Sequence, residues 1–254
     1  MKQLLLMFLV SYLLSTSVCA KKISVVVGWN KPPYVISQTD TGFEVDLVRA
    51  VLRDMGHEIS PIYVPFGRSA RLLSMGSIDI GLTLNNSHDV SSDFLSDAYV
   101  VYQNVAVTRK DRALSIHSIE DLKGKSVAAF QTASSVLGEK YGDTLSSHPT
   151  YIEMASQDSQ VAMLMLGSID VAVMDRNIFN YFKSQDAQYA DDEVVLHELF
   201  PLVAYHAAIP DQQLRAAFNE TLQTFIEDGR YQALLDVYGL ENLLHTMKQN
   251  RPPR

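Results

Sequence analysis

At residues 73–82 the chain reads Leu-Ser-Met-Gly-Ser-Ile-Asp-Ile-Gly-Leu, and at residues 165–174 it reads Met-Leu-Gly-Ser-Ile-Asp-Val-Ala-Val-Met. The core Gly-Ser-Ile-Asp recurs unchanged 91 residues later. In both copies an apolar run with helical spacing stops at the glycine, the residue that takes the left-handed position after a helix with least strain. A short apolar run typical of a buried strand follows. The repeat predicts two similar α/β lobes with a cleft between them.

Residues 1–20 have the composition of a secretory signal peptide. Leu4–Leu14 is an almost purely apolar run that is too short to span a bilayer as a stable helix. Val18 and Ala20 supply the small residues of a cleavage site, which predicts cleavage after Ala20 and export to the periplasm. The alternative is a lipoprotein anchored through Cys19, although the residues before this cysteine match the lipidation pattern poorly.

The predicted mature chain contains no cysteine, because Cys19 is the only one and leaves with the signal peptide. This argues against a disulfide, a zinc–thiolate site and a cysteine nucleophile. A hydrophobic fraction of 47% is enough to build an apolar core instead. The signal peptide carries one lysine and no acid, so its loss moves the formal net charge from −8 to −9. An acidic chain without a basic tract is not expected to bind nucleic acid.

The sequence predicts no cofactor and no metal site. No two histidines have the spacing of metal ligands on one helix. After the signal peptide we find no second apolar segment long enough to cross a membrane. The scattered histidines are His57, His88, His117, His148, His197, His206 and His245.

The hydrophobic pattern predicts the order strand, helix, strand, helix, strand in each lobe. A capping box at Ser118–Asp121 opens the second lobe with a short helix. In lobe 1 we expect strand 23–28, helix 43–55, strand 58–64, helix 68–75 and the first repeat strand. In lobe 2 we expect strand 126–130, helix 134–141, strand 150–154, helix 156–166 and strand 169–174. Strand 202–209, helices 211–228 and 231–238, and a polar, frayed tail at 241–254 complete the chain.

Seven landmarks in this order and spacing make the mature chain resemble the periplasmic solute-binding proteins of family 3, which serve polar amino-acid ABC transporters. The resemblance implies a type II periplasmic binding fold, in which two α/β lobes are joined by a two-strand hinge. It divides the chain into lobe 1 at 21–109 and 206–254 and lobe 2 at 110–205. The landmarks are Pro32-Pro33-Tyr34, Gly42-Phe-Glu-Val-Asp-Leu47, Gly76-Ser-Ile-Asp79, Asp93-Phe-Leu-Ser96 with Tyr99, Asp121-Leu-Lys-Gly-Lys125, Gly167-Ser-Ile-Asp-Val-Ala172 with Asp175, and Asp228-Gly-Arg-Tyr231.

The resemblance implies a monomer that captures a small, polar, amino-acid-like solute by lobe closure and delivers it to an inner-membrane ABC permease. Two alternatives share the fold. An orphan binding protein would feed a sensor kinase or another receptor. A cyclohexadienyl dehydratase-like enzyme would need an acid–base pair, for which His88 and Asp175 are the candidates.

Ligands of open α/β sheets bind beyond the carboxyl ends of the strands, and this rule selects candidate ligand residues. Aromatic rings at such positions either sandwich a ligand or pack against their own lobe. Ser134 and Ser135 either hold an anion at a helix start or only cap that helix. The candidates are Trp29, Tyr34, Arg68, Thr83, Asn85, Asn86, His88, Gln131, Ser134, Ser135 and Asp175, with Asn30 and Arg176 beside them.

Asp175 follows the second repeat strand, and the resemblance implies that it receives the ammonium group of the ligand. The other interpretation is the N-cap of the next helix. The chain departs from the family after the first repeat strand, because it reads Thr-Leu-Asn-Asn-Ser-His at 83–88, without the arginine that clamps an α-carboxylate. Arg68 either substitutes for it or is solvated. Ala133 stands where the family has a glycine.

Overall fold

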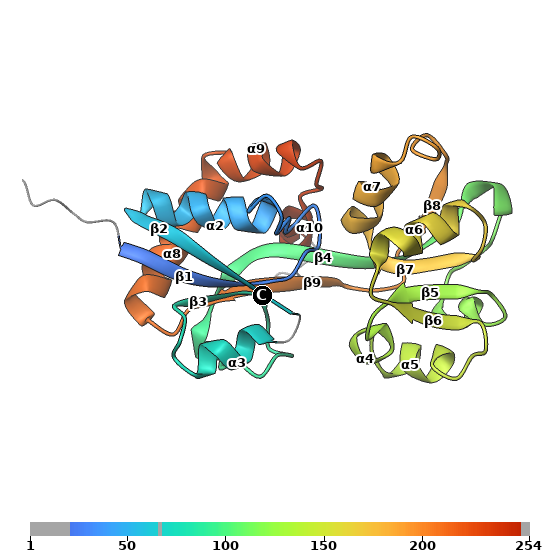
Figure 1. Ribbon diagram of the computed structural model, residues 1–254, viewed down its shortest axis with the longest axis horizontal. Coiled ribbons are helices and arrows are strands. Elements are labelled where there is room, and N and C mark those ends of the chain that lie inside the picture. Colours follow the sequence, from blue (N-terminus) through green and yellow to red (C-terminus); the bar gives the residue numbers. More distant parts are fainter. Residues whose placement is uncertain (1–20, 66–67, 250–254) are drawn as a thin grey trace, which may run out of the picture.

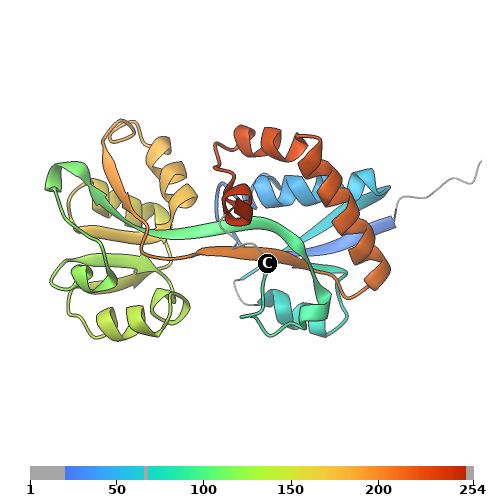
Figure 2. The same cartoon turned by 180° about the vertical axis from the view of Figure 1, so that it is seen from behind.

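The computed structural model describes residues 21–65 and 68–249, so the predicted signal peptide and its cleavage after Ala20 lie outside the described residues. Two α/β lobes are visible in Figure 1, and two long strands run between them in both views (Figure 2). This confirms the predicted fold class. Among the described residues, no helix is both long and apolar enough to cross a membrane.

The lobe that holds the N-terminal strand is built on a sheet of order β2-β1-β3-β9-β4. Strands β1 to β3 are parallel, and β9 inserts antiparallel to both of its neighbours. The strands are β1 (Lys21–Gly28), β2 (His57–Val64), β3 (Ile80–Leu84), β4 (Leu95–Arg109) and β9 (Leu202–Ala208). The helices are α2 (Phe43–Asp54), α3 (Arg68–Ser74), α8 (Gln212–Glu227), α9 (Arg230–Val237) and α10 (Leu243–Gln249).

The other lobe extends the same path through β4-β7-β5-β6, and β8 also pairs with β4. Its strands are β5 (Val127–Phe130), β6 (Tyr151–Met154), β7 (Val171–Asp175) and β8 (Val194–His197). Its helices are α4 (Ala133–Val136), α5 (Glu139–Leu145), α6 (Gln157–Met165) and α7 (Arg176–Gln185). Short 3-10 turns cover Ser92–Phe94, Lys110–Arg112 and Ile119–Leu122.

Strand β4 belongs to both sheets. It pairs with β9 up to Gln103 and with β7 from Asn104 onward. The change of partner places the passage between the lobes within one unbroken strand. The lobe boundaries at 109/110 and 205/206 remain predictions.

The repeated motif forms the same helix, turn and strand in both lobes, as predicted. Gly76 has φ 67° and Gly167 has φ 76°, the left-handed conformation that glycine adopts without a Cβ clash. Both glycines donate their N–H to a helix carbonyl three residues earlier at 3.0 Å. The strands that follow, β3 and β7, are buried along their whole length.

Each motif aspartate is hydrogen-bonded to a serine at the first strand of its lobe, a contact that we call the serine–aspartate latch. Asp79 Oδ2 accepts from the N–H and hydroxyl of Ser24 at 2.8 and 2.7 Å, and Asp170 Oδ2 accepts from those of Ser126 at 3.0 and 2.8 Å. In both lobes the aspartate N–H donates back to the serine Oγ at 2.9 Å. The conserved spelling of the repeat therefore fixes the turn to the sheet.

We expect Asp79→Ala and Asp170→Ala each to lower the free energy of unfolding by about 1–2 kcal/mol, because each removes two charge-assisted hydrogen bonds at a partly exposed site. Urea unfolding of the two variants measures the effect. The control is Asp191→Ala at an exposed position of the second lobe. A latch variant no less stable than this control would contradict the role.

Three sequence predictions of local structure were wrong. The predicted helix 134–141 is two short helices, because Gly138 has φ 97° and interrupts the helical path. The predicted frayed tail contains α10, whose Leu243 and Leu244 are buried. Strand β8 was not predicted, and it lies at the edge of the second sheet against the end of β4.

Candidate functional site

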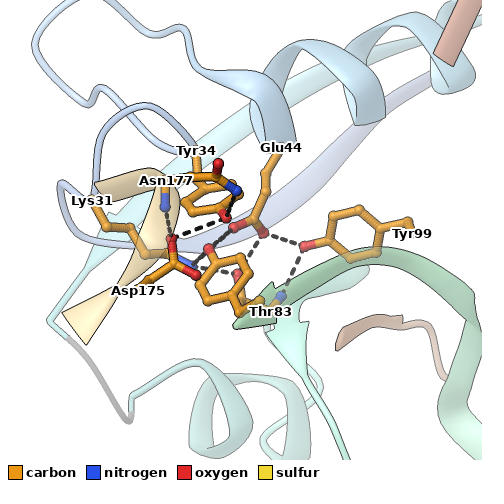
Figure 3. A network of polar contacts seen from close by, with 8 residues as sticks. Lys31, Tyr34, Glu44, Thr83, Tyr99, Asp175 and Asn177 are labelled. Atoms are coloured by element: carbon orange, nitrogen blue, oxygen red, sulfur yellow. Dashed lines mark hydrogen bonds and ion pairs between the residues drawn. The ribbon is translucent and has the colours of Figure 1, made fainter. Parts of the chain in front are cut away.

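A buried carboxylate, Glu44 in the first turn of α2, is the centre of a polar network beneath the C-terminal ends of β1 and β3 (Figure 3). Its Oε1 accepts from Lys31 Nζ at 2.9 Å, and its Oε2 accepts from Thr83 Oγ1 at 2.6 Å. The hydroxyls of Tyr99 and Tyr102 on β4 also donate to it. The carboxylate has no exposed surface, so these four groups replace its hydration.

The network favours the ionised form of Glu44. Burial raises the pKa of this carboxyl, but the Lys31 ammonium and the hydroxyl hydrogen bonds outweigh burial and hold the pKa below its usual value. Burial and the nearby Glu44 charge raise the pKa of Tyr99 and Tyr102 well above the ordinary range. Both phenols therefore stay protonated and act as donors to the carboxylate.

Thr83 is held in a strained backbone conformation at this site. Its φ is 57°, in the left-handed region that a β-branched residue rarely adopts, and the register between β3 and β9 is irregular there. The conformation lets the Thr83 N–H donate to Tyr99 OH at 3.0 Å while its hydroxyl donates to Glu44. Strain of this kind persists where the surrounding contacts over-determine it.

Asp175, at the end of β7, contributes the corresponding carboxylate of the other lobe. Its Oδ1 accepts from the N–H groups of Asn177 and Ile178 at 3.0 and 3.1 Å, which confirms the N-cap interpretation. Its Oδ2 accepts from Gln103 N–H at 3.1 Å, and Tyr34 OH donates to Oδ1 at 3.1 Å. Burial raises the pKa of Asp175 to about 6, although these hydrogen bonds oppose the shift.

Tyr34 connects the two lobes. It lies between β1 and α2, and its hydroxyl donates to Asp175 and accepts from Asn177 Nδ2 at 2.9 Å (Figure 3). Its ring stacks on Tyr102 with 4.1 Å between centroids, and Tyr102 in turn lies 5.0 Å from Tyr205 on β9. Of the predicted residues, Tyr34, Thr83 and Asp175 are thus brought into one network.

A small pocket of about 20 Å³ lies beside this network, at the carboxyl ends of β1 and β3. Its lining comes from both strands, from the loop after each and from the start of α3. It is lined by Gly28, Lys31, Ser69, Ala70, Leu82, Thr83, Leu84 and His88.

The loop after β3 is bonded within itself. Asn85 Oδ1 accepts from the N–H and hydroxyl of Ser87, and the Asn85 N–H donates to His88 Nδ1 at 3.1 Å. Burial lowers the pKa of His88. No hydrogen bond joins His88 to Asp175 among the described contacts, so the acid–base pair of the enzyme hypothesis is not assembled here.

The predicted anion pocket at α4 is occupied by a side chain of the protein. Glu153 on β6 accepts from the N–H groups of Thr132 and Ser134 at 2.7 and 2.8 Å, and from Tyr151 OH at 2.9 Å. The glycine-like position there is Thr132, with φ 70°, whereas Ala133 is already helical.

Several other candidates point away from the network. Trp29 is 62% exposed and contacts solvent, and four more polar candidates are exposed on their loops and helix starts. These four are Arg68, Asn86, Gln131 and Ser135.

Sequence reasoning missed Lys31, Glu44, Tyr99, Tyr102 and Asn177. Glu44 resembles an ordinary acid in the first turn of a helix, and the tyrosines of β4 have the pattern of core residues. The available signal was the lysine in the Trp-Asn-Lys-Pro-Pro loop beside a strand end. Within residues 21–65 and 68–249, no group of three or more acidic, histidine or cysteine side chains is placed to hold a metal ion.

Comparison with known proteins gives consistent matches. A profile of bacterial extracellular solute-binding proteins, family 3, matches residues 23–241. The arginine-binding extracellular protein of Bacillus subtilis (strain 168) is 26% identical over 226 residues, which cover 84% of each chain. An arginine-binding protein of Corynebacterium glutamicum is 25% identical over 224 residues, covering 83% of this chain and 71% of the relative.

The fold is also similar to that of solved binding proteins. The GLUR0 ligand-binding core in complex with L-glutamate has a TM-score of 0.69 and 17% identity, covering 87% of this chain and 99% of the other. An ancestral amino-acid-binding protein described as a precursor of cyclohexadienyl dehydratase has a TM-score of 0.66 and 20% identity, covering 85% and 95%.

Proposed function

The chain belongs to the bacterial extracellular solute-binding proteins of family 3, and from this premise we propose that it binds a free amino acid between its lobes in the periplasm. The family and the curated relatives are binding proteins, and the two named relatives bind arginine. Arginine is therefore the first ligand to test. Delivery to an ABC permease, by a monomer released from its signal peptide after Ala20, is part of the proposal.

One observation carries the proposal: Tyr34 of one lobe donates to Asp175 of the other at 3.1 Å, beside the strands that join the lobes. Polar groups from two lobes thus converge at one point, where closure on a solute excludes water and strengthens each charge-assisted contact. The ammonium group of an amino acid is a suitable partner for the Asp175 carboxylate. Binding without turnover is the expected activity.

A thermal-shift screen of the purified mature protein against the twenty amino acids tests the proposal. A ligand at a hundred times its Kd stabilises the folded state by about 2.7 kcal/mol. We expect a clear rise in melting temperature with arginine or another amino acid and none with sugars. A flat response to all amino acids would contradict the proposed function.

Small-angle scattering with the amino acid that shifts the melting temperature tests the closure mechanism. We expect the radius of gyration to fall on binding. Binding without compaction would contradict closure. Neighbouring permease and ATPase genes would support transport, whereas a neighbouring sensor kinase would support the receptor alternative.

A further inference from the structure

The charge that the first lobe presents at its pocket is that of Lys31. Its side chain is 13% exposed, whereas the side chain of its partner Glu44 is fully enclosed. Among the described residues that line the pocket, Lys31 is the only lysine or arginine, and none is acidic. A solute entering this pocket therefore meets the ammonium and cannot touch the carboxylate behind it.

Glu44 keeps its hydrogen bonds without the lysine. Three hydroxyls donate to it, from Thr83, Tyr99 and Tyr102. Three O–H donors satisfy most of what a buried carboxylate requires. Lys31 is thus not needed to fill an otherwise empty acceptor.

The lysine is held on its other sides by oxygen atoms only. Its Nζ donates to Thr83 Oγ1 at 2.9 Å and to Tyr102 OH at 2.8 Å, besides Glu44. Both hydroxyls already direct their own hydrogen at Glu44, so each loses only an accepted bond if the ammonium turns away. The flexible lysine stem can make this turn with the Glu44 cluster left intact.

From this placement we infer that Lys31 binds the carboxylate of the solute. The inference rests on the proposed function and assigns one end of the ligand: an anionic group on the first lobe, at Lys31, opposite the Asp175 carboxylate on the second. Together the two charges select a zwitterion over a simple amine.

Paired ligands that differ only in the carboxylate test the inference by calorimetric titration. The pairs are arginine with agmatine, lysine with cadaverine, and histidine with histamine. For wild-type protein we expect the amino acid to bind about tenfold to a hundredfold more tightly than its amine, as a charge-assisted contact provides. In Lys31→Met we expect the two members of a pair to bind within about twofold of each other, while Lys31→Arg keeps the preference.

Lys22→Met is the matched control, because Lys22 lies exposed on the same strand at the end remote from the pocket. If Lys31→Met does not fold, the double variant Lys31→Met/Glu44→Gln removes both charges and replaces it. Wild-type protein that binds an amine as tightly as its amino acid overturns the inference alone, and so does an undiminished preference in a folded Lys31 variant. Binding of none of the six compounds contradicts the proposed function and the inference with it.

Discussion

Glu44→Ala is expected to lower the free energy of unfolding by about 3–5 kcal/mol, the largest loss of any single substitution in this site. The substitution leaves the Lys31 ammonium beside an empty cavity and takes the acceptor from the hydroxyls of Thr83, Tyr99 and Tyr102. Buried donors without an acceptor cost their full desolvation free energy, and the strained Thr83 loses one of its restraints.

Urea unfolding of the mature protein measures this loss. Glu58→Ala is the control, since Glu58 is an exposed glutamate on β2 of the same lobe and should change stability by no more than about 0.5 kcal/mol. A Glu44→Ala variant within 1 kcal/mol of wild type, about the worth of one ordinary hydrogen bond, would show that the network is not a centre of stability.

Asp175→Asn is expected to gain stability relative to wild type as the pH rises. Burial raises the pKa of Asp175 to about 6 in the fold, against about 3.9 in an unfolded chain. A carboxyl with a raised folded-state pKa contributes stability that is fully present below about pH 4 and is lost as the pH rises through 6. A two-unit shift corresponds to about 3 kcal/mol.

The measurement is the difference in unfolding free energy between wild type and Asp175→Asn at pH 4 and pH 8. We expect wild type to lose about 3 kcal/mol against the variant over this range. Asp170→Asn is the opposite control. Hydrogen bonds from Ser126 hold the pKa of Asp170 below its usual value, so the wild-type advantage there is lost as the pH falls. A difference for Asp175→Asn that does not change with pH would contradict the buried, raised carboxyl.

The sequence predicted those features that local pattern and repetition decide. The Gly-Ser-Ile-Asp repeat identified both helix–turn–strand units, and the position of Asp175 after β7 indicated its capping role. The break at Gly138 was missed because the residues around it have helical propensity on both sides. The tail helix α10 was missed because its two buried leucines matter only once β4 lies beneath them.

The polar network could not be predicted because its contacts are far apart along the chain. Tyr99 and Tyr102 lie 55 and 58 residues from Glu44, and Tyr34 lies 141 residues from Asp175. Whether an acid in a first helical turn faces solvent or a set of phenols depends on the packing of β4 against that helix. The α4 anion pocket was predicted from local pattern alone, which does not show that Glu153 reaches it from the next strand.

The point where β4 exchanges partners lies next to the polar network. Gln103 pairs with β9, its N–H donates to Asp175, and its side-chain oxygen accepts from Arg176 at 2.7 Å. Angular motion about this peptide displaces each atom in proportion to its distance from it. A rearrangement of a few tenths of an ångström around Tyr34 and Asp175 is therefore geared up to a much longer arc at the outer rims of both lobes. A protein that docks on those rims senses the occupied site by leverage, without contacting the solute.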